Sequence, residues 1–167
     1  MNNPNFNPTD PRDGVFLTSP QRAHAHSEEN KAIVRDAVGL YVRLVAHAIS
    51  HDWAQLHNFA SIPSGMARDW LDPKWLAREV LRPIRTALAQ SEIVETANGR
   101  MAAMRAGEEV GVWFPTAATR DLRERIWSCA SDWFPHLLPA KDHVEFWHST
   151  ICTRSPVDYE GRRRRAA

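Results

Sequence analysis

Apolar residues recur every three or four positions through the segment 28–50, the spacing that places them on one face of an α-helix. That face comprises Val34, Val38, Tyr41, Val45 and Ala48. Ser27 is a good helix N-cap, and the two acidic residues after it favour the positive end of the helix dipole. We therefore predict a helix from about 28 to 50, followed by shorter helices at 52–59 and 65–71.

Another long helix is predicted at 73–90. Asp72 suits its capping position, and Pro73 suits its first turn, where the missing N–H has no helical partner. Pro83 lies inside the helix and is expected to bend it. On a regular helical wheel, four basic residues share an arc of roughly 80° away from the apolar side. These residues are Lys74, Arg78, Arg82 and Arg85.

Beyond this helix the pattern favours β-structure. Residues 93–96 are mostly strong strand formers, and the dipeptide Asn98-Gly99 is a typical hairpin turn. A further strand is expected at 110–114, and the alternation of side chains at 143–150 also predicts a strand.

Residues 119–133 return to helical spacing, and their larger apolar side chains form one stripe. The stripe comprises Leu122, Ile126, Cys129 and Trp133. Together, the elements predict a helix-dominated α+β fold with about four to five helices and a small antiparallel sheet or hairpin. The order helix, turn, helix and wing at 65–105 is that of a winged-helix-like core.

The length of 167 residues suits one domain with its own core. Residues 1–26 are rich in Asn and Pro and are expected to form a flexible N-terminal arm, with a single globular domain at 27–160. Residues 161–167 are expected to be a disordered basic tail. The formal net charge is +1, and it becomes −3 without the four consecutive arginines of this tail. Those arginines are Arg162, Arg163, Arg164 and Arg165.

The composition argues against membrane and secreted classes of protein. Hydrophobic residues make up 43% and charged residues 25%, which is ordinary for a globular domain. The most apolar segment is too short to span a bilayer and contains Arg43 and His47. The first residues lack the pattern of a signal peptide, and Cys129 and Cys152 lack the spacing of a zinc site or a disulfide framework. We expect a soluble cytoplasmic protein that binds no membrane.

Histidines provide the candidates for acid–base chemistry. His47 and His51 have the spacing of two metal ligands on a helix, but the segment lacks the glutamate of a zinc protease. His143 and Glu145 would lie on one side of the predicted strand, which suggests a hydrolase-type enzyme. No nucleophile, phosphate-binding loop or cofactor motif accompanies them. We therefore expect no metal and no cofactor, and a hydrolase-type enzyme that uses His143 and Glu145 is a third hypothesis behind two non-enzymatic ones.

The basic helix face supports the leading hypothesis for function. Four cations along about 17 Å of helix can follow phosphates in a groove. Because Glu79 lies off the arc, we expect no acidic side chain to neutralise it. The sequence therefore predicts a small non-enzymatic domain that binds DNA or RNA through this face, with the arginine tail adding affinity.

The alternative is a protein-interaction module, such as an inhibitor or an assembly factor. Three of the seven tryptophans, Trp53, Trp70 and Trp75, surround the same predicted helical junction. An exposed aromatic cluster is typical of binding hot spots. The near-neutral net charge favours this alternative, whereas the one-sided basic face favours nucleic acid.

Overall fold

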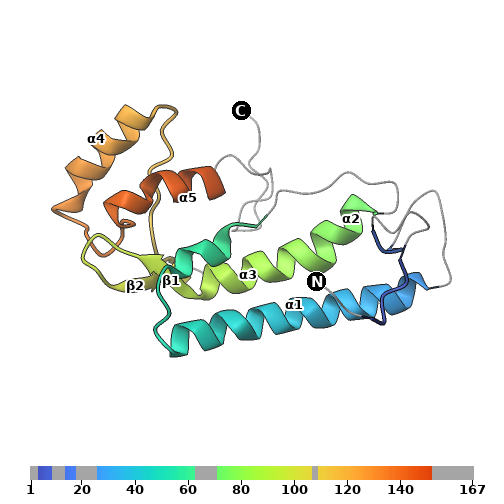
Figure 1. Ribbon diagram of the computed structural model, residues 1–167. Helices are drawn as coiled ribbons and strands as arrows, with labels where there is room; N and C mark the ends of the chain where they lie inside the picture. The colour runs from blue at the N-terminus through green and yellow to red at the C-terminus, as the bar shows by residue number, and fades with distance from the viewer. Residues whose placement is uncertain (1–3, 9–13, 18–25, 63–70, 107–108, 152–167) are drawn as a thin grey trace. The chain divides into compact units, whose positions relative to one another are not determined.

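The computed structural model describes residues 4–8, 14–17, 26–62, 71–106 and 109–151. Its internal contacts divide the chain into two compact units. Unit 1 comprises residues 1–43 and 63–84, and unit 2 comprises residues 44–62 and 85–167. The predicted α+β class with helix dominating is confirmed (Figure 1). The division into an arm, a single globular domain and a tail stays a prediction.

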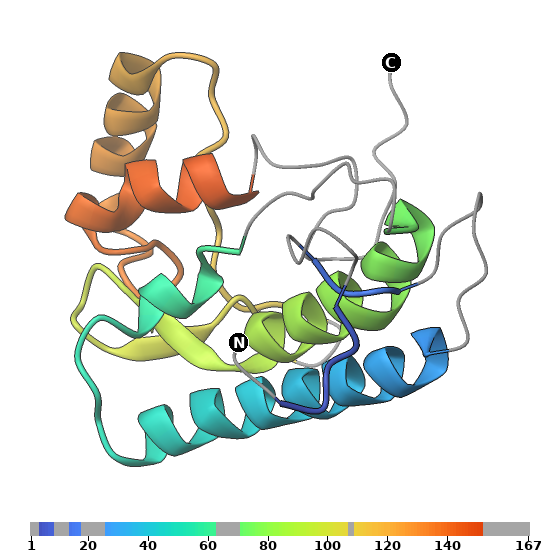
Figure 2. The same cartoon turned by 45° about the vertical axis from the view of Figure 1, so that its right-hand side comes forward.

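Helix α1, Ser27–Ser50, forms where the sequence predicts it. Within unit 1 it lies beside a second helical run, and the two run in the same direction (Figures 1 and 2). This second run consists of α2 (Pro73–Leu76), η2 (Ala77–Leu81) and α3 (Arg82–Gln90). The Asp72 side chain caps it as expected, accepting a hydrogen bond of 2.8 Å from the backbone N–H of Lys74.

Element η2 is a turn of π-helix that lies directly before Pro83. Proline removes one i→i−4 hydrogen bond and crowds the carbonyl four residues earlier, so the helix before it must adjust. In η2 the backbone N–H of Arg82 bonds the carbonyl of Ala77, five residues back. Because a π-helical turn contains one extra residue, every later side chain lies roughly 100° back from the position that a regular α-helix would give it.

The core of unit 1 joins α2 to the N-terminal segments. Leu17, Leu71 and Trp75 are buried against one another. The side chain of Asn30, fully buried on α1, donates hydrogen bonds to the carbonyls of Asn7 (2.9 Å) and Phe16 (2.7 Å). These bonds hold the described parts of the N-terminal segment against the helix.

In unit 2 the predicted hairpin is present. Strands β1 (Glu92–Glu95) and β2 (Met101–Ala103) pair antiparallel. Gly99 has a positive φ of 77°, and its backbone N–H bonds the carbonyl of Thr96, so Asn98-Gly99 turns the chain as predicted. Strands β3 (Arg105–Ala106) and β4 (Glu109–Val110) form a second short pair.

The strand predicted at 110–114 is therefore wrong beyond Val110, where β4 ends. The backbone of Gly111 lies very close to that of Ala103, and the regular pairing of β3 with β4 does not continue past this point. A Cβ atom on this glycine would lie 2.2 Å from the carbonyl oxygen of Ala103. Segment 138–140 instead lies along β1, with the backbone N–H of Ala140 donating to the carbonyl of Glu95 at 2.7 Å.

The remaining elements of unit 2 are helical. Element η1 (Leu56–Ala60) is shorter than the helix predicted at 52–59, because Asp52 and Gln55 adopt positive φ angles that no α-helix accommodates. Helix α4, Arg120–Ser131, confirms the helix predicted at 119–133. The helix predicted at 65–71 lies almost entirely outside the described residues.

The strand predicted at 143–150 is wrong, because the chain forms η3 (Lys141–His143) and α5 (Val144–Ile151) there. Val144, Trp147 and Thr150 are the buried residues of α5, and they are three positions apart. The segment therefore has helical spacing as well as alternation, and helical packing against the core of unit 2 prevails.

Candidate functional site

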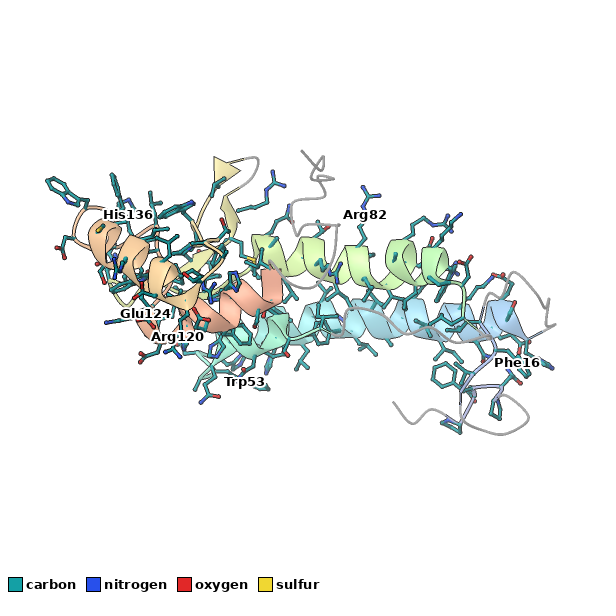
Figure 3. All side chains as sticks on the ribbon, turned by 90° about the horizontal axis from the view of Figure 1, so that it is seen from above. Phe16, Trp53, Arg82, Arg120, Glu124 and His136 are labelled. Atoms are coloured by element: carbon teal, nitrogen blue, oxygen red, sulfur yellow. The ribbon has the colours of Figure 1, made fainter. Side chains whose placement is uncertain are left out.

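The predicted basic face is only partly assembled. Lys74, Arg78 and Arg82 are exposed, and Arg82 points away from the ribbon in Figure 3. Arg85 is buried, with only 9% of its surface exposed. The expected arc assumed a regular helix, and the π-helical turn rotates Arg85 away from it. The tail arginines lie outside the described residues.

The expectation that no acidic side chain neutralises this face is wrong, because Glu79 lies beside it. Its carboxylate accepts a hydrogen bond of 2.7 Å from Nε of Arg78 and one of 3.3 Å from Nε of Arg35 on α1. Both guanidinium groups hold the pKa of Glu79 below its ordinary value, so the carboxylate is ionised at neutral pH. The face therefore does have an acidic neighbour, and Arg78 is partly neutralised.

The three tryptophans of the alternative hypothesis do not form an exposed cluster. Trp75 is a core residue of unit 1 with 4% exposure. Trp53 is exposed in unit 2, where its ring packs edge-on against His47 with centroids 5.9 Å apart. Trp70 lies outside the described residues.

His143 and Glu145 do not form an acid–base pair, because each contacts a different partner. The Glu145 carboxylate accepts bonds of 2.8 and 2.7 Å from Nε and Nη2 of Arg123, which holds its pKa below the ordinary value. Nδ1 of His143 lies 4.0 Å from Glu95, and its ring stacks on His57 with centroids 4.0 Å apart. Glu145 is therefore a charged partner of arginine rather than a proton donor.

His47 near the end of α1 and His51 just beyond the helix contact each other. The rings of His47 and His51 lie 3.9 Å apart, and Nδ1 of His51 bonds the carbonyl of His47. Among the residues that the structure describes, no three His, Cys, Asp or Glu side chains are placed to hold an ion.

The most unusual surface of unit 2 lies on helix α4. Most of its apolar stripe faces solvent: Leu122 is 47% exposed, Cys129 is exposed, and Trp133 just beyond the helix is 78% exposed. Phe134 follows with 53% exposure. We call these four residues the apolar surface. Soluble monomers rarely leave large apolar side chains so close together in water.

Another side of α4 is held inward by polar contacts. Arg123 is only 6% exposed, and besides its two bonds to Glu145 it donates from Nη1 to the carbonyl of Ala117 at 2.7 Å. One turn later, the indole N–H of Trp127 donates to the carbonyl of Pro139 at 2.8 Å. These bonds fix the rotation of the helix, and the apolar surface is turned outward as a result.

The charges on α4 neutralise one another within the helix. Arg120 pairs with Glu124 at 2.7 Å, and Arg125 pairs with Asp121 at 3.1 Å. Arg120 and Glu124 are labelled on this helix in Figure 3. Each charged side chain of α4 therefore has a partner, and Asp132 just beyond the helix adds one exposed carboxylate beside Trp133.

Sequence reasoning placed Leu122, Cys129 and Trp133 on one stripe but did not predict that the stripe faces solvent. Arg123 and Trp127 form a second stripe at i,i+4, and the spacing alone does not decide which stripe is buried. The sequence offers one signal of this exposure, the aromatic pair Trp133-Phe134. The pair follows the last turn of the helix, so few helical side chains are near enough to cover it.

Comparison with known protein families, with curated proteins and with solved structures finds no match to this chain. In the part of the chain that the structure describes, no helix has the length and apolar character needed to cross a membrane. Function is therefore inferred from the apolar surface of α4 and the basic side chains of unit 1.

The stack of His57 on His143 predicts a loss of stability in mild acid. Burial and then the charge of His143 hold the pKa of His57 below 6.5, and Glu95 acts in the opposite direction. The unfolded chain therefore takes up a proton more readily than the folded chain. The stabilisation is present above pH 6.5 and is lost as the pH falls through the folded-state pKa. The melting temperature should thus fall from pH 7 to pH 5.

The variant His57→Gln should show a smaller fall over the same interval. Burial also holds the pKa of His148 down, and this histidine should account for part of the remaining fall. His136→Gln, which changes an exposed side chain, serves as the control. Identical pH profiles for His57→Gln and the parent protein would contradict the assignment.

Proposed function

We propose that this chain is a protein-interaction module that uses the apolar surface of α4. The observation that carries the proposal is the exposure of Trp133, 78%, just beyond the end of a helix that Arg123 anchors to α5. Exposed aromatic side chains are enriched among the residues that dominate protein–protein affinity. Burying a large apolar side chain stabilises a complex by roughly 1.5–3 kcal/mol.

The partner we propose is a protein with an uncharged apolar groove that accepts a helix. Leu122 and Cys129 are seven positions apart on α4, which is a spacing by which an amphipathic helix anchors in such a groove, and Trp133 follows just beyond the helix. Because the charges of α4 are paired within the helix, a partner would gain little from charge complementarity. We also propose a cytoplasmic location, because Cys129 is an exposed free thiol and reducing compartments keep thiols in this state.

A photoreactive amino acid in place of Trp133 is expected to form crosslinks to the partner. The purified partner should then bind the parent protein in a two-component assay, and Trp133→Ser should weaken the affinity at least about tenfold, as loss of a hot spot does. Trp53→Ser removes another exposed tryptophan of unit 2 away from α4 and serves as the control. Raising the salt from 50 to 300 mM should change the affinity by less than about threefold.

If the partner is a second copy of this chain, sedimentation will show a dimer that Trp133→Ser dissociates. Equal effects of Trp133→Ser and Trp53→Ser would contradict the proposal. Strong weakening by salt would also contradict it, since the surface offers little excess charge.

Binding to DNA or RNA remains a second proposed function. It rests on Lys74 and Arg82, which are exposed on one helical run and have no acidic partner among the described residues. With Arg78 they provide three cations instead of the four that the sequence suggested. The tail arginines at 162–165 would add affinity without specificity.

Three phosphate contacts on a duplex imply a slope of about −2.7 for log affinity against log salt, from roughly −0.9 per contact. In a chain truncated after Glu160, Lys74→Gln together with Arg82→Gln should flatten this slope by nearly two units. Arg85→Gln should leave the slope unchanged, because Arg85 is buried. Affinity for DNA and RNA that does not vary with salt would exclude this function.

A further inference from the structure

Unit 1 contains a cleft of about 470 Å³ between the first turns of α1 and the α2–η2 run. This volume is in the range of small-molecule sites. Four basic side chains line it, Lys31 and Arg35 from α1 and Lys74 and Arg78 from the α2–η2 run. The cleft lies wholly within unit 1 and shares no residue with the apolar surface of α4.

Both arginines are held in place by one carboxylate. Glu79 does not line the cleft, but its two oxygens accept hydrogen bonds from Nε of Arg35 and Nε of Arg78. The terminal nitrogens of these guanidinium groups bond no acceptor among the described residues. Two pairs of donors are therefore preorganised at the wall of the cleft, and their position is set through Nε.

The acidic side chains of the cleft are already engaged. Asp72 accepts from the backbone N–H of Lys74 as the helix cap, and Glu28 pairs with Lys31. Counting the four cations against Glu28, Asp72 and Glu79 leaves a net charge of +1. An anion therefore fits this cleft better than a cation does.

Trp75 adds a donor of a different kind. It forms part of the cleft wall and is 4% exposed, and its buried indole N–H has no acceptor among the described residues. A buried donor without a partner is uncommon in native proteins and frequently marks a bound water or ligand.

We infer that this cleft binds the phosphate group of a small phosphomonoester. A carboxylate offers two coplanar oxygens and a single negative charge. A phosphate monoester offers three terminal oxygens, enough for the free nitrogens of Arg35 and Arg78 and the ammonium of Lys74. The rest of the ligand would lie against the side of the cleft that Trp75 forms.

The test uses phenyl phosphate as the probe and titration calorimetry as the measurement, with NMR to follow the indole N–H of Trp75. Saturable binding is expected, with benzoate at least tenfold weaker. Arg78→Gln, which changes an exposed side chain, should weaken binding about tenfold. Arg43→Gln changes an exposed arginine of unit 1 that lies on α1 outside the cleft, and should leave the affinity unchanged.

Glu79→Gln distinguishes a positioned site from a general attraction of charge. This variant makes the cleft more positive, so an effect of charge alone would tighten binding. If Glu79 holds both guanidinium groups, binding of phenyl phosphate should instead weaken several-fold. The circular dichroism spectrum and melting temperature of each variant establish that it is folded.

Three results would overturn the inference. These are the absence of saturable binding at millimolar phenyl phosphate, equal weakening by Arg78→Gln and Arg43→Gln, and tighter binding by Glu79→Gln. If the first result is accompanied by binding of a single-stranded oligonucleotide, an extended cationic surface is favoured over a small-molecule cleft.

Discussion

The ion pair between Arg123 and Glu145 determines how helix α4 is oriented. Its two hydrogen bonds, of 2.8 and 2.7 Å, join the inward side of α4 to α5. A buried guanidinium without a partner would be strongly unfavourable, so this contact fixes the rotation of α4. Leu122 and Cys129 lie roughly 100–120° round the helix from Arg123, so with Arg123 facing inward they are on a different side, where both are exposed. The apolar surface is a consequence of the ion pair.

The π-helical turn before Pro83 has a corresponding effect in the second helical run. It delays the later side chains by about one residue, which is why Arg85 does not join Lys74, Arg78 and Arg82 on the exposed face. The same region contains Glu79, which holds Arg78 and Arg35 together. Unit 1 therefore offers a small cluster of positioned cations rather than the long basic stripe of a regular helix.

Features with a local signal could be predicted from the sequence. Helix α1 follows from its apolar spacing, the start of α2 from Asp72 and Pro73, and the hairpin from Asn98-Gly99. Segment 143–150 could not be assigned, because its side chains fit both a strand and a helix and only packing of Trp147 in the core decides between them. The exposure of the apolar side of α4 could not be predicted either. It depends on the contact of Arg123 with Glu145, which is more than twenty positions away in the sequence.

Of the predicted site residues, Lys74, Arg78 and Arg82 are exposed as expected, whereas Arg85 and Trp75 are buried. A helical wheel assumes a regular α-helix, so it misplaces the residues that follow a π-helical turn. The burial of Trp75 likewise depends on Leu17 and Leu71, which come from separate segments of unit 1. The first error has a local cause, the π-helical turn before Pro83, and the second has a tertiary cause.

The accessibility of Cys129 tests the orientation of α4 most directly. In Cys152→Ser, Cys129 is the single thiol, and its rate of alkylation by a maleimide can be compared in the folded and the urea-unfolded chain. The orientation set by Arg123 and Glu145 predicts similar rates, within about a factor of ten, in dilute folded protein. Protection of the folded thiol by a hundredfold or more at the same dilution would mean that this side of α4 is buried, and would contradict the account.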